Sequence, residues 1–233
     1  PFICPYRHIE TPAMVTRFVE RIAEIRAAIG DDIDLAVDFH GRVSPAMAPW
    51  LCRELEPYGL MFVEEPVLPE NVDAMAKVAR MTTIPIATGE RKFTTFEFRE
   101  ILEKQAANVL QPDLCHAGGI SQVMKIAAMG ETYFCSMAPH NPLGPLALAA
   151  CLQVDTVIPN FTAQEHPSFE DGWDLGGPYL KKPFEIVDGY ISIPEGPGMG
   201  IEIDEAGIKE NQIDGRWETP RVMFADDHSF GEW

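Results

Sequence analysis

The sequence predicts an α/β fold in which parallel strands close into a barrel. Short apolar runs alternate with amphipathic stretches at a period of about 25 residues, and each run ends in an ionisable residue. This alternation is typical of parallel strands with right-handed crossovers. An open doubly wound sheet would also show it, but that fold usually carries a glycine-rich phosphate loop after its first strand, and none follows these runs. Barrel enzymes build their sites at the ends of several strands, so we expect a barrel.

Strands are expected where the apolar runs lie, and helices where apolar residues recur at helical spacing. The strand candidates cover residues 34–37, 60–63, 84–88, 108–110, 133–137 and 160–163. The helix candidates cover residues 12–29, a segment that opens at Ser44-Pro45, and residues 71–80, 95–105, 119–130 and 143–152. In the first of these helices, Thr11 suits the N-cap, Pro12 suits the first helical position and Gly30 suits the stop.

The order of these elements predicts two parts. Residues 1–183 are expected to be the C-terminal part of a (β/α) barrel catalytic domain, with about six strands where a closed barrel has eight. No strand precedes the first helix, so we expect an incomplete barrel that lacks its first strands. Residues 184–233 are expected to form a separate C-terminal segment. It opens with a hairpin over residues 184–193 that turns at Asp188-Gly189.

Charge and composition exclude several classes of function. The net charge is -18, which argues against nucleic-acid partners and anionic membrane surfaces. No apolar run is long enough for a membrane span, and no secretory leader is visible. The five cysteines are widely spaced without a CxxC pair, which indicates neither a disulfide framework nor a zinc site. We therefore expect a protein of the reducing cytoplasm.

Three carboxylates recur at the ends of the first three strands. Asp38, Glu64 and Glu90 are separated by 26 residues and again by 26. Equal spacing in a strand-helix repeat predicts the same position on successive strands, so the three should converge. Carboxylates brought together repel one another unless a cation lies between them, and hard oxygen ligands favour Mg²⁺. A helix cap or a surface charge would explain any one of them, but not three in register.

Two neighbours of these carboxylates are also candidates. Glu65 follows Glu64, and because side chains alternate along a strand, only one of the two can face inward. The spacing selects Glu64 as the ligand and leaves Glu65 beside the site. His40 lies two residues after Asp38, so the same alternation places its imidazole near the metal.

The later strand ends carry a further set of polar residues. Asp113 and His140 lie on adjacent predicted strands, where a carboxylate would orient a histidine and raise its basicity, as a general base requires. Two unrelated polar residues are the alternative. Glu165 ends the last strand and would donate to an oxyanion if it were protonated.

These residues lie in motifs that together resemble the mandelate racemase subgroup of the enolase superfamily. The resemblance runs from about residue 12 to residue 205, and residues 165–173 depart from its usual pattern. The motifs are Asp38-Phe39-His40-Gly41-Arg42, Glu64-Glu65-Pro66, Gly89-Glu90-Arg91, Gln111-Pro112-Asp113, His116-Ala117-Gly118-Gly119, Ala138-Pro139-His140 and Gln164-Glu165.

The resemblance implies a modified TIM barrel of the (β/α)7β type. The chain would lack the N-terminal capping domain of that fold, and residues 184–233 would return toward it. The resemblance also implies an active site with one Mg²⁺ bound by Asp38, Glu64 and Glu90. The implied substrate is a galactonate-type aldonic acid, and the implied partners are this small molecule and further copies of the chain.

The implied reaction is dehydration to a 2-keto-3-deoxy acid. His140, paired with Asp113, would take the proton α to the substrate carboxylate, and Glu165 would help to stabilise the enediolate. His40 would then act as the acid that expels the 3-hydroxyl. Glu65, Arg91 and Trp173 are the expected substrate-binding residues.

Two other functions stay open at this point. A racemase or epimerase of the same superfamily would use a second base on an early strand, whereas His40 favours elimination. A catalytically silent barrel is the third hypothesis. It gives no reason for the chain to carry the whole set of polar strand ends.

Overall fold

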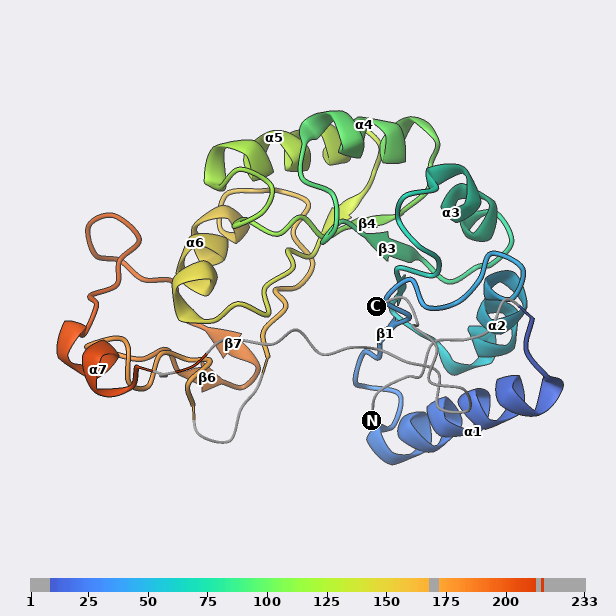
Figure 1. Ribbon diagram of the computed structural model, residues 1–233, viewed down its shortest axis with the longest axis horizontal. Helices are drawn as coiled ribbons and strands as arrows, with labels where there is room; N and C mark the ends of the chain where they lie inside the picture. Colours follow the sequence, from blue (N-terminus) through green and yellow to red (C-terminus); the bar gives the residue numbers. More distant parts are fainter. Residues whose placement is uncertain (1–8, 168–171, 213–214, 216–233) are drawn as a thin grey trace. The chain divides into compact units, whose positions relative to one another are not determined.

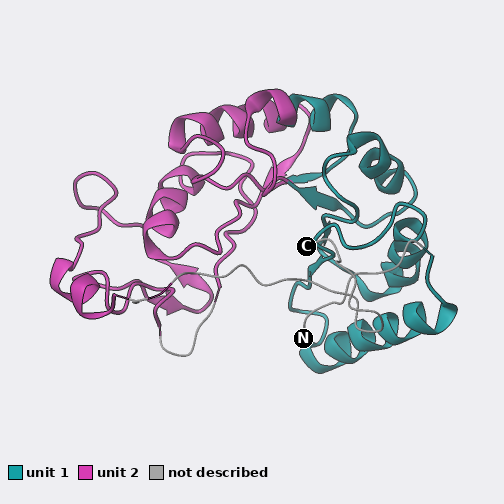
Figure 2. Cartoon of the chain, in the orientation of Figure 1, with its two compact units in different colours: residues 1–88, 98–109, 219–233 teal, residues 89–97, 110–218 magenta. Residues whose placement is uncertain are grey.

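The structure is a computed structural model that describes residues 9–167, 172–212 and 215. The chain divides into two compact units (Figure 2). Unit 1 comprises residues 1–88, 98–109 and 219–233, and unit 2 comprises residues 89–97 and 110–218. Each unit is described by itself. The predicted division into residues 1–183 and 184–233 follows different boundaries and stays a prediction, and residues 216–233 lie outside the described part.

Strands and helices alternate along the chain, as the sequence predicts (Figure 1). In order, the elements are α1 (Pro12–Ile29), β1 (Val37–Asp38), α2 (Ala48–Leu55), the 3-10 helix η1 (Glu56–Tyr58), β2 (Val63–Glu64), α3 (Val72–Ala79), β3 (Ile86–Thr88), α4 (Thr95–Glu103), β4 (Val109–Leu110), α5 (Ile120–Glu131), β5 (Ser136–Met137), α6 (Pro145–Asp155), β6 (Ile186–Val187), β7 (Tyr190–Ile191) and α7 (Glu205–Glu210).

In unit 1, strands β1, β2 and β3 pair in parallel. Val37 lies opposite Val63, and Val63 lies opposite Ile86. The start of β4 continues the order, because the Asn108 N–H donates to the Ile86 carbonyl at 2.7 Å. The strands are held by a core of fully buried side chains, among them Phe39, Leu51, Leu55, Met75 and Ile86. The ring of Phe18 on α1 meets that of Phe39 edge-on at 5.7 Å between ring centres, which ties α1 to the end of β1.

In unit 2, the end of β4 neighbours β5. The Ala138 N–H donates to the Leu110 carbonyl at 3.0 Å, and the Met137 N–H donates to the Asn160 carbonyl at 2.8 Å. The sheet therefore keeps the sequence order β1-β2-β3-β4-β5. The sixth predicted strand, residues 160–163, is only an isolated bridge between Met137 and Phe161. Helices α5 and α6 contact each other beside this part of the sheet (Figure 1).

The predicted bounds agree with the structure most closely for α1 and least closely for the strands. Helix α1 has the predicted bounds, and Gly30 ends it at φ 76°, although Thr11 makes no side-chain cap. The helix predicted to open at Ser44-Pro45 is wrong in its start, because α2 begins at Ala48. The Ser44 carbonyl accepts from Met47 N and Ala48 N, so a turn precedes the helix there. The strands are shorter than predicted because only two or three residues of each apolar run make ladder hydrogen bonds.

The C-terminal part of unit 2 begins with the predicted hairpin. Strands β6 and β7 are antiparallel, and Asp188 and Gly189 turn between them at φ 50° and 81°, as a tight hairpin turn requires. A small apolar cluster lies beside α6. It comprises Leu148, Ala149, Leu152, Leu180 and Phe184, with Leu175, Ile191 and Ile201 packed against it. Among the described helices, none combines the length and the apolar character that a membrane crossing requires.

Candidate active site

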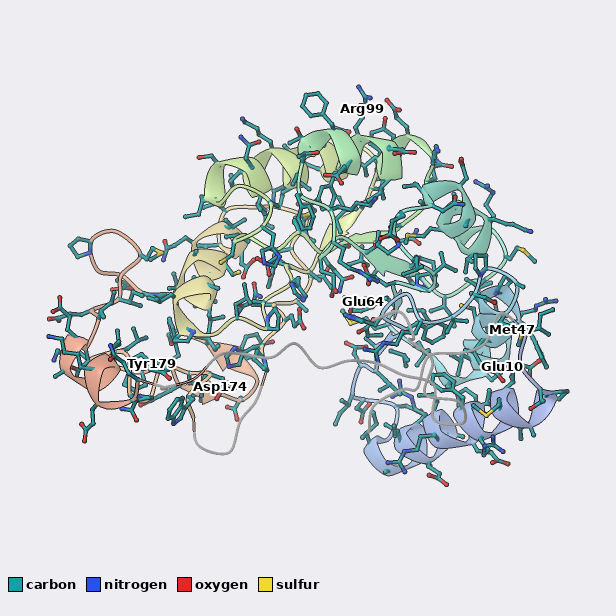
Figure 3. The ribbon with its side chains drawn as sticks, viewed as in Figure 1. Glu10, Met47, Glu64, Arg99, Asp174 and Tyr179 are labelled. Atoms are coloured by element: carbon teal, nitrogen blue, oxygen red, sulfur yellow. The ribbon has the colours of Figure 1, made fainter. Side chains whose placement is uncertain are left out.

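In unit 1, the first two predicted metal ligands lie side by side. Asp38 and Glu64 are the last residues of β1 and β2, and their Cα atoms are partners in the parallel ladder. The predicted convergence of these two strand ends is therefore confirmed. Glu64, labelled in Figure 3, is half-buried, and Asp38 is more exposed. Ion binding at this pair stays a prediction.

The equal spacing does not continue into β3. The ladder partner of Glu64 is Ala87, so Glu90 lies three residues beyond that level. The prediction that Glu90 lies at the same level as Glu64 was wrong, because a constant interval in sequence does not fix how many residues follow the paired part of a strand. Gly89 provides this exit in unit 2. At φ 152°, its position would bring a Cβ to 2.7 Å from the Gln111 backbone, so only glycine fits.

Glu65 has a more enclosed environment than Glu64. Its side chain is fully buried, and its backbone has the unusual φ of 37°. Its N–H donates to the Ala87 carbonyl and its carbonyl accepts from Gly41 N, both near 2.9 Å. A buried carboxylate requires compensation by charge or hydrogen bonds. Glu65 is thus a ligand candidate of the same chemical type as Glu64, and its predicted substrate-binding role stays a prediction.

His40 lies beside Asp38, but not for the predicted reason. It follows the strand at φ 50°, in a turn where its N–H donates to Asp38 Oδ1 at 2.6 Å. Its Nδ1 lies 3.4 Å from Asp38 Oδ2. Strand alternation therefore does not place the imidazole; the Asp38 side chain does so by stabilising the turn. The two side chains lie close together, and the predicted place of the imidazole near a metal ion stays a prediction.

In unit 2, His140 and Asp113 form the predicted pair. The two residues are bridged as parallel neighbours beyond β4 and β5. His140 Nδ1 lies 2.8 Å from Asp113 Oδ2 and donates to it, because an ionised carboxylate can only accept. The Cys115 N–H donates to the other oxygen, Oδ1, at 2.7 Å. This arrangement fixes the ring and leaves Nε2 as the nitrogen that can exchange a proton.

The Nε2 atom of His140 faces two further carboxylates. Glu90 Oε2 lies 3.2 Å away and Glu165 Oε2 lies 3.9 Å away. Glu165 is oriented by the Asn141 N–H, which donates to its Oε2 at 3.0 Å. Glu90 is buried, whereas the Glu165 side chain is 43% exposed. The site thus surrounds one imidazole with three acidic side chains.

These surroundings change the proton affinity of the pair. Burial lowers the pKa of His140, but the Asp113 hydrogen bond and the charges of Glu165, Glu90 and Asp113 outweigh it and raise the pKa to about 9. Burial raises the pKa of Asp113. The hydrogen bonds from His140 and Cys115 and the nearby His116 outweigh it, and the net pKa lies below its ordinary value. In this charge balance the histidine is protonated at neutral pH.

The other predicted substrate-binding residues have defined neighbours. Arg91 Nε lies 4.0 Å from Glu90 Oε1, so its charge lies next to a predicted ligand. The ring of Trp173 meets that of Tyr179 edge-on at 5.3 Å. Neither contact tests substrate binding, and both roles stay predictions.

The structure also contains a histidine–aspartate pair that no sequence motif indicated. His166 Nε2 lies 2.9 Å from Asp174 Oδ2, and both side chains are buried. His166 lies in the stretch of residues 165–173 that departs from the family pattern, and Asp174 directly follows it, so the family motifs offer no template for the pair. The departure itself was the signal that could have drawn attention to these residues.

The donor set suits a hard divalent cation. The candidate ligands are carboxylates and an imidazole, and His40, Glu65 and Glu90 each offer one ligand atom of a kind that can hold a metal ion. The raised pKa of His140 indicates an excess of negative charge around its ring, which a cation near Glu90 would offset.

Comparisons with known proteins show the family to which the chain belongs. A family model described as "Enolase C-terminal domain-like" matches residues 8–207. The D-galactonate dehydratase of Ralstonia pickettii (strain 12J) is 47% identical over 231 residues, which cover 97% of this chain and 60% of that protein. The D-galactonate dehydratase of Xanthomonas euvesicatoria pv. vesicatoria is 46% identical over 230 residues, with the same coverage. The chain thus spans about 60% of the length of these curated relatives.

Solved structures give the same result. A mandelate racemase/muconate lactonizing enzyme-like protein from Roseovarius sp. TM1035 is 42% identical with a TM-score of 0.80, over 91% of this chain and 53% of that one. A member of the enolase superfamily from Salmonella typhimurium is 32% identical with a TM-score of 0.81, over 88% and 53%. The predicted α/β fold class of the modified TIM-barrel type is confirmed, and so is the predicted superfamily.

Proposed function

Because the chain belongs to the enolase C-terminal domain-like family, we propose that the protein is a Mg²⁺-dependent hydro-lyase that dehydrates a galactonate-type aldonic acid. The observation that carries the proposal is the His140–Asp113 pair, in which His140 Nε2 faces Glu90 and Glu165. The relatives named D-galactonate dehydratase support the substrate class. The product would be a 2-keto-3-deoxy acid.

Asp38, Glu64 and Glu90 would hold the Mg²⁺ ion in this proposal. The chemistry that a bound Mg²⁺ supplies is charge stabilisation of the substrate carboxylate. Two observations support the fit: Asp38 and Glu64 are ladder partners, and the charges of Glu165, Glu90 and Asp113 raise the pKa of His140. Offsetting that charge would also lower the pKa of His140 toward the neutral range, where a general base is effective.

His140 is the proposed base. Its Nε2 takes the proton from the carbon next to the substrate carboxylate, while Asp113 holds Nδ1–H and stabilises the imidazolium that forms. Glu165 Oε2 lies 3.9 Å from the same Nε2 atom, and its orientation is set by the Asn141 N–H. In its protonated form Glu165 would donate a hydrogen bond to the oxygen on which charge develops in the enediolate.

His40 is the proposed acid for the second half of the reaction. Loss of the 3-hydroxyl breaks a carbon–oxygen bond, and a proton from His40 would let the group leave as water. The turn that Asp38 stabilises holds the imidazole in place. The enol that remains tautomerises to the 2-keto acid, so one water is lost and no oxidant is required.

The test is an assay of the full-length protein with Mg²⁺ and a panel of aldonic acids. The proposal expects 2-keto acid from galactonate or a close stereoisomer, and no product after EDTA treatment. If metal is bound and no member of the panel gives keto acid, the proposal is wrong. Exchange of the α-proton with deuterium from solvent, without keto acid, would instead support a racemase or epimerase.

A matched pair of variants tests the ligand set. We expect Glu64→Gln to weaken Mg²⁺ binding at least tenfold and Glu65→Gln to weaken it less, because the proposal makes Glu64 the ligand. Isothermal titration with Mg²⁺ measures both. The reverse order would transfer the ligand role to the buried Glu65.

We propose a cytoplasmic protein that acts on a small sugar acid and assembles from several copies of itself. Among the described residues, no disulfide joins Cys52, Cys115, Cys135 and Cys151, which fits a reducing compartment. Sedimentation velocity of the full-length protein measures the assembly. A monomer at micromolar concentration would contradict it.

A further inference from the structure

His166 and Asp174 form a buried pair in unit 2. The two side chains are 8% and 2% exposed, and Nε2 donates to Oδ2 at 2.9 Å. Burying polar or charged groups is unfavourable unless their geometry is good, and removal of one partner leaves the other uncompensated. Loss of this contact would therefore destabilise both of the segments that it joins.

Asp174 belongs to the C-terminal part of unit 2. Asp174, labelled in Figure 3, lies in a tight turn in which the Leu175 N–H donates to the Gly172 carbonyl at 3.2 Å. Leu175 packs against the cluster of Leu148 and Phe184, and its carbonyl accepts from Phe184 N at 2.8 Å. Asp174 is thus held by the packing of this cluster onto α6.

The other end of the contact is the neighbour of Glu165. The backbone N–H of Glu165 lies 3.4 Å from the Pro139 carbonyl, which is a long hydrogen bond. The Gln164 side chain adds bonds to the carbonyls of Pro139 and Glu165 at 2.9 and 2.7 Å. Directly after Glu165, the next side-chain contact among the described residues is the bond of His166 to Asp174. The position of the Glu165 carboxylate therefore depends on what holds residue 166.

We propose that His166 and Asp174 are positioning residues for Glu165: the pair fixes the segment after Glu165 to the cluster on α6 and so keeps its carboxylate beside His140. This inference rests on the proposed function of Glu165. Nothing in the proposed reaction otherwise uses the pair.

The surroundings of the pair favour a positioning role over proton transfer. His166 Nδ1 and Asp174 Oδ1 are both buried without a hydrogen-bond partner among the described residues. A proton-transfer histidine needs a second group within reach of its free nitrogen, as Nε2 of His140 has. Among the described residues, the His166 ring bonds to Asp174 alone, and this bond holds the ring without offering a second group for proton transfer.

The experiment is a double-mutant cycle in the full-length protein with Mg²⁺ and the aldonic acid that it dehydrates. We expect Asp174→Asn to lower kcat between ten- and a hundredfold with KM changed less than twofold, because a displaced Glu165 affects the transition state more than binding. In a Glu165→Gln background the same change should lower kcat less than twofold. Equal losses in both backgrounds would overturn the proposal.

Two controls keep the result interpretable. Asp204→Asn removes an exposed ion pair with Lys181 in the same unit and should leave kcat unchanged. His166→Gln keeps a side-chain N–H donor near the Nε2 position and should retain most of the activity, whereas His166→Ala should behave like Asp174→Asn. If the glutamine and alanine variants lose activity equally, the hydrogen bond is not what positions Glu165.

A structural measurement that does not depend on catalytic activity tests this proposal separately from the proposed function. Crystal structures of the wild type and of Asp174→Asn should show the bond from Asn141 N to Glu165 Oε2 present in the first and broken in the second. If the wild type dehydrates no aldonic acid, the proposed function fails, and this comparison still decides the positioning role. An unmoved Glu165 carboxylate in Asp174→Asn would overturn it.

Discussion

Unit 2 contains two histidine–aspartate pairs of nearly the same geometry and very different surroundings. The pairs His140–Asp113 and His166–Asp174 have nitrogen–oxygen distances of 2.8 and 2.9 Å. The second nitrogen of His140 faces Glu90 and Glu165, whereas that of His166 has no hydrogen-bond partner among the described residues. The pair itself therefore does not define a catalytic group. The groups on the far side of the ring decide whether it can move a proton.

The largest expected effect is that of His140→Asn. The amide cannot act as a base, so we expect turnover to fall by about 10³-fold or more, while Mg²⁺ binding persists. His166→Asn is the matched change in the other pair and should cost at most about a hundredfold. Steady-state assays of both variants give the comparison. Similar losses for the two would mean that the surroundings do not distinguish the pairs.

Asp113→Asn is expected to have the next largest effect. The amide leaves His140 without its ionised acceptor, so the ring loses its fixed orientation and the imidazolium loses stabilisation. We expect kcat to fall by about 10²-fold or more. The pH dependence of kcat/KM should shift as well, because the hydrogen bond to Asp113 is a main cause of the raised pKa of His140. An unshifted profile would contradict the assigned pairing.

A smaller effect is expected on stability in the protein without metal. The pKa of His140 is about 9 when folded, above its ordinary value of 6.5. The protonated form is therefore favoured by folding, so its stabilisation is complete below about pH 6.5 and is lost as the pH rises through 9. A shift of this size corresponds to a few kcal/mol, on the order of 1.4 kcal/mol per pKa unit.

Urea unfolding of the EDTA-treated protein at several pH values between 6 and 10 measures this dependence. His140→Asn should be less stable at pH 6 and should show a flatter pH profile. Saturating Mg²⁺ should also flatten the profile, since it would offset the carboxylates that raise the pKa. If the stability of His140→Asn still falls steeply as the pH rises, another group causes the pH dependence.

The smallest expected effect is that of Trp173→Phe, next to the second pair. Phenylalanine keeps an aromatic ring for the contact with Tyr179 and leaves Asp174 unchanged. We expect kcat to stay within twofold and KM to rise only a few-fold if the indole contacts substrate. Full steady-state analysis over the substrate range decides this. A loss in kcat as large as that of Asp174→Asn would move the positioning role from the pair to Trp173.

The parts that were predictable from sequence are those set by local pattern. The stripe of apolar residues in α1 and the turn at Asp188-Gly189 depend on neighbouring residues, and both are present. The pairing of Asp113 with His140 followed from strand order, which the alternation of elements predicts. Such features need no knowledge of distant packing.

The features that the sequence did not reveal depend on register and tertiary contact. The level of Glu90 relative to Glu64 is set by the length of the β3 exit, which a constant sequence interval conceals. The position of His40 depends on a turn rather than on strand alternation. His166 and Asp174 are eight residues apart and belong to none of the motifs, so their contact depends on tertiary structure that a local pattern does not show.

The close approach of Gly89 to the Gln111 backbone sets a limit on redesign of this scaffold. Any side chain at residue 89 would force the two segments apart, and Glu90 and Asp113 lie one and two residues away from the contact. Libraries that aim at new sugar acids should therefore keep residues 89 and 111 constant. Variation is better directed at Trp173, which is a predicted substrate-binding residue.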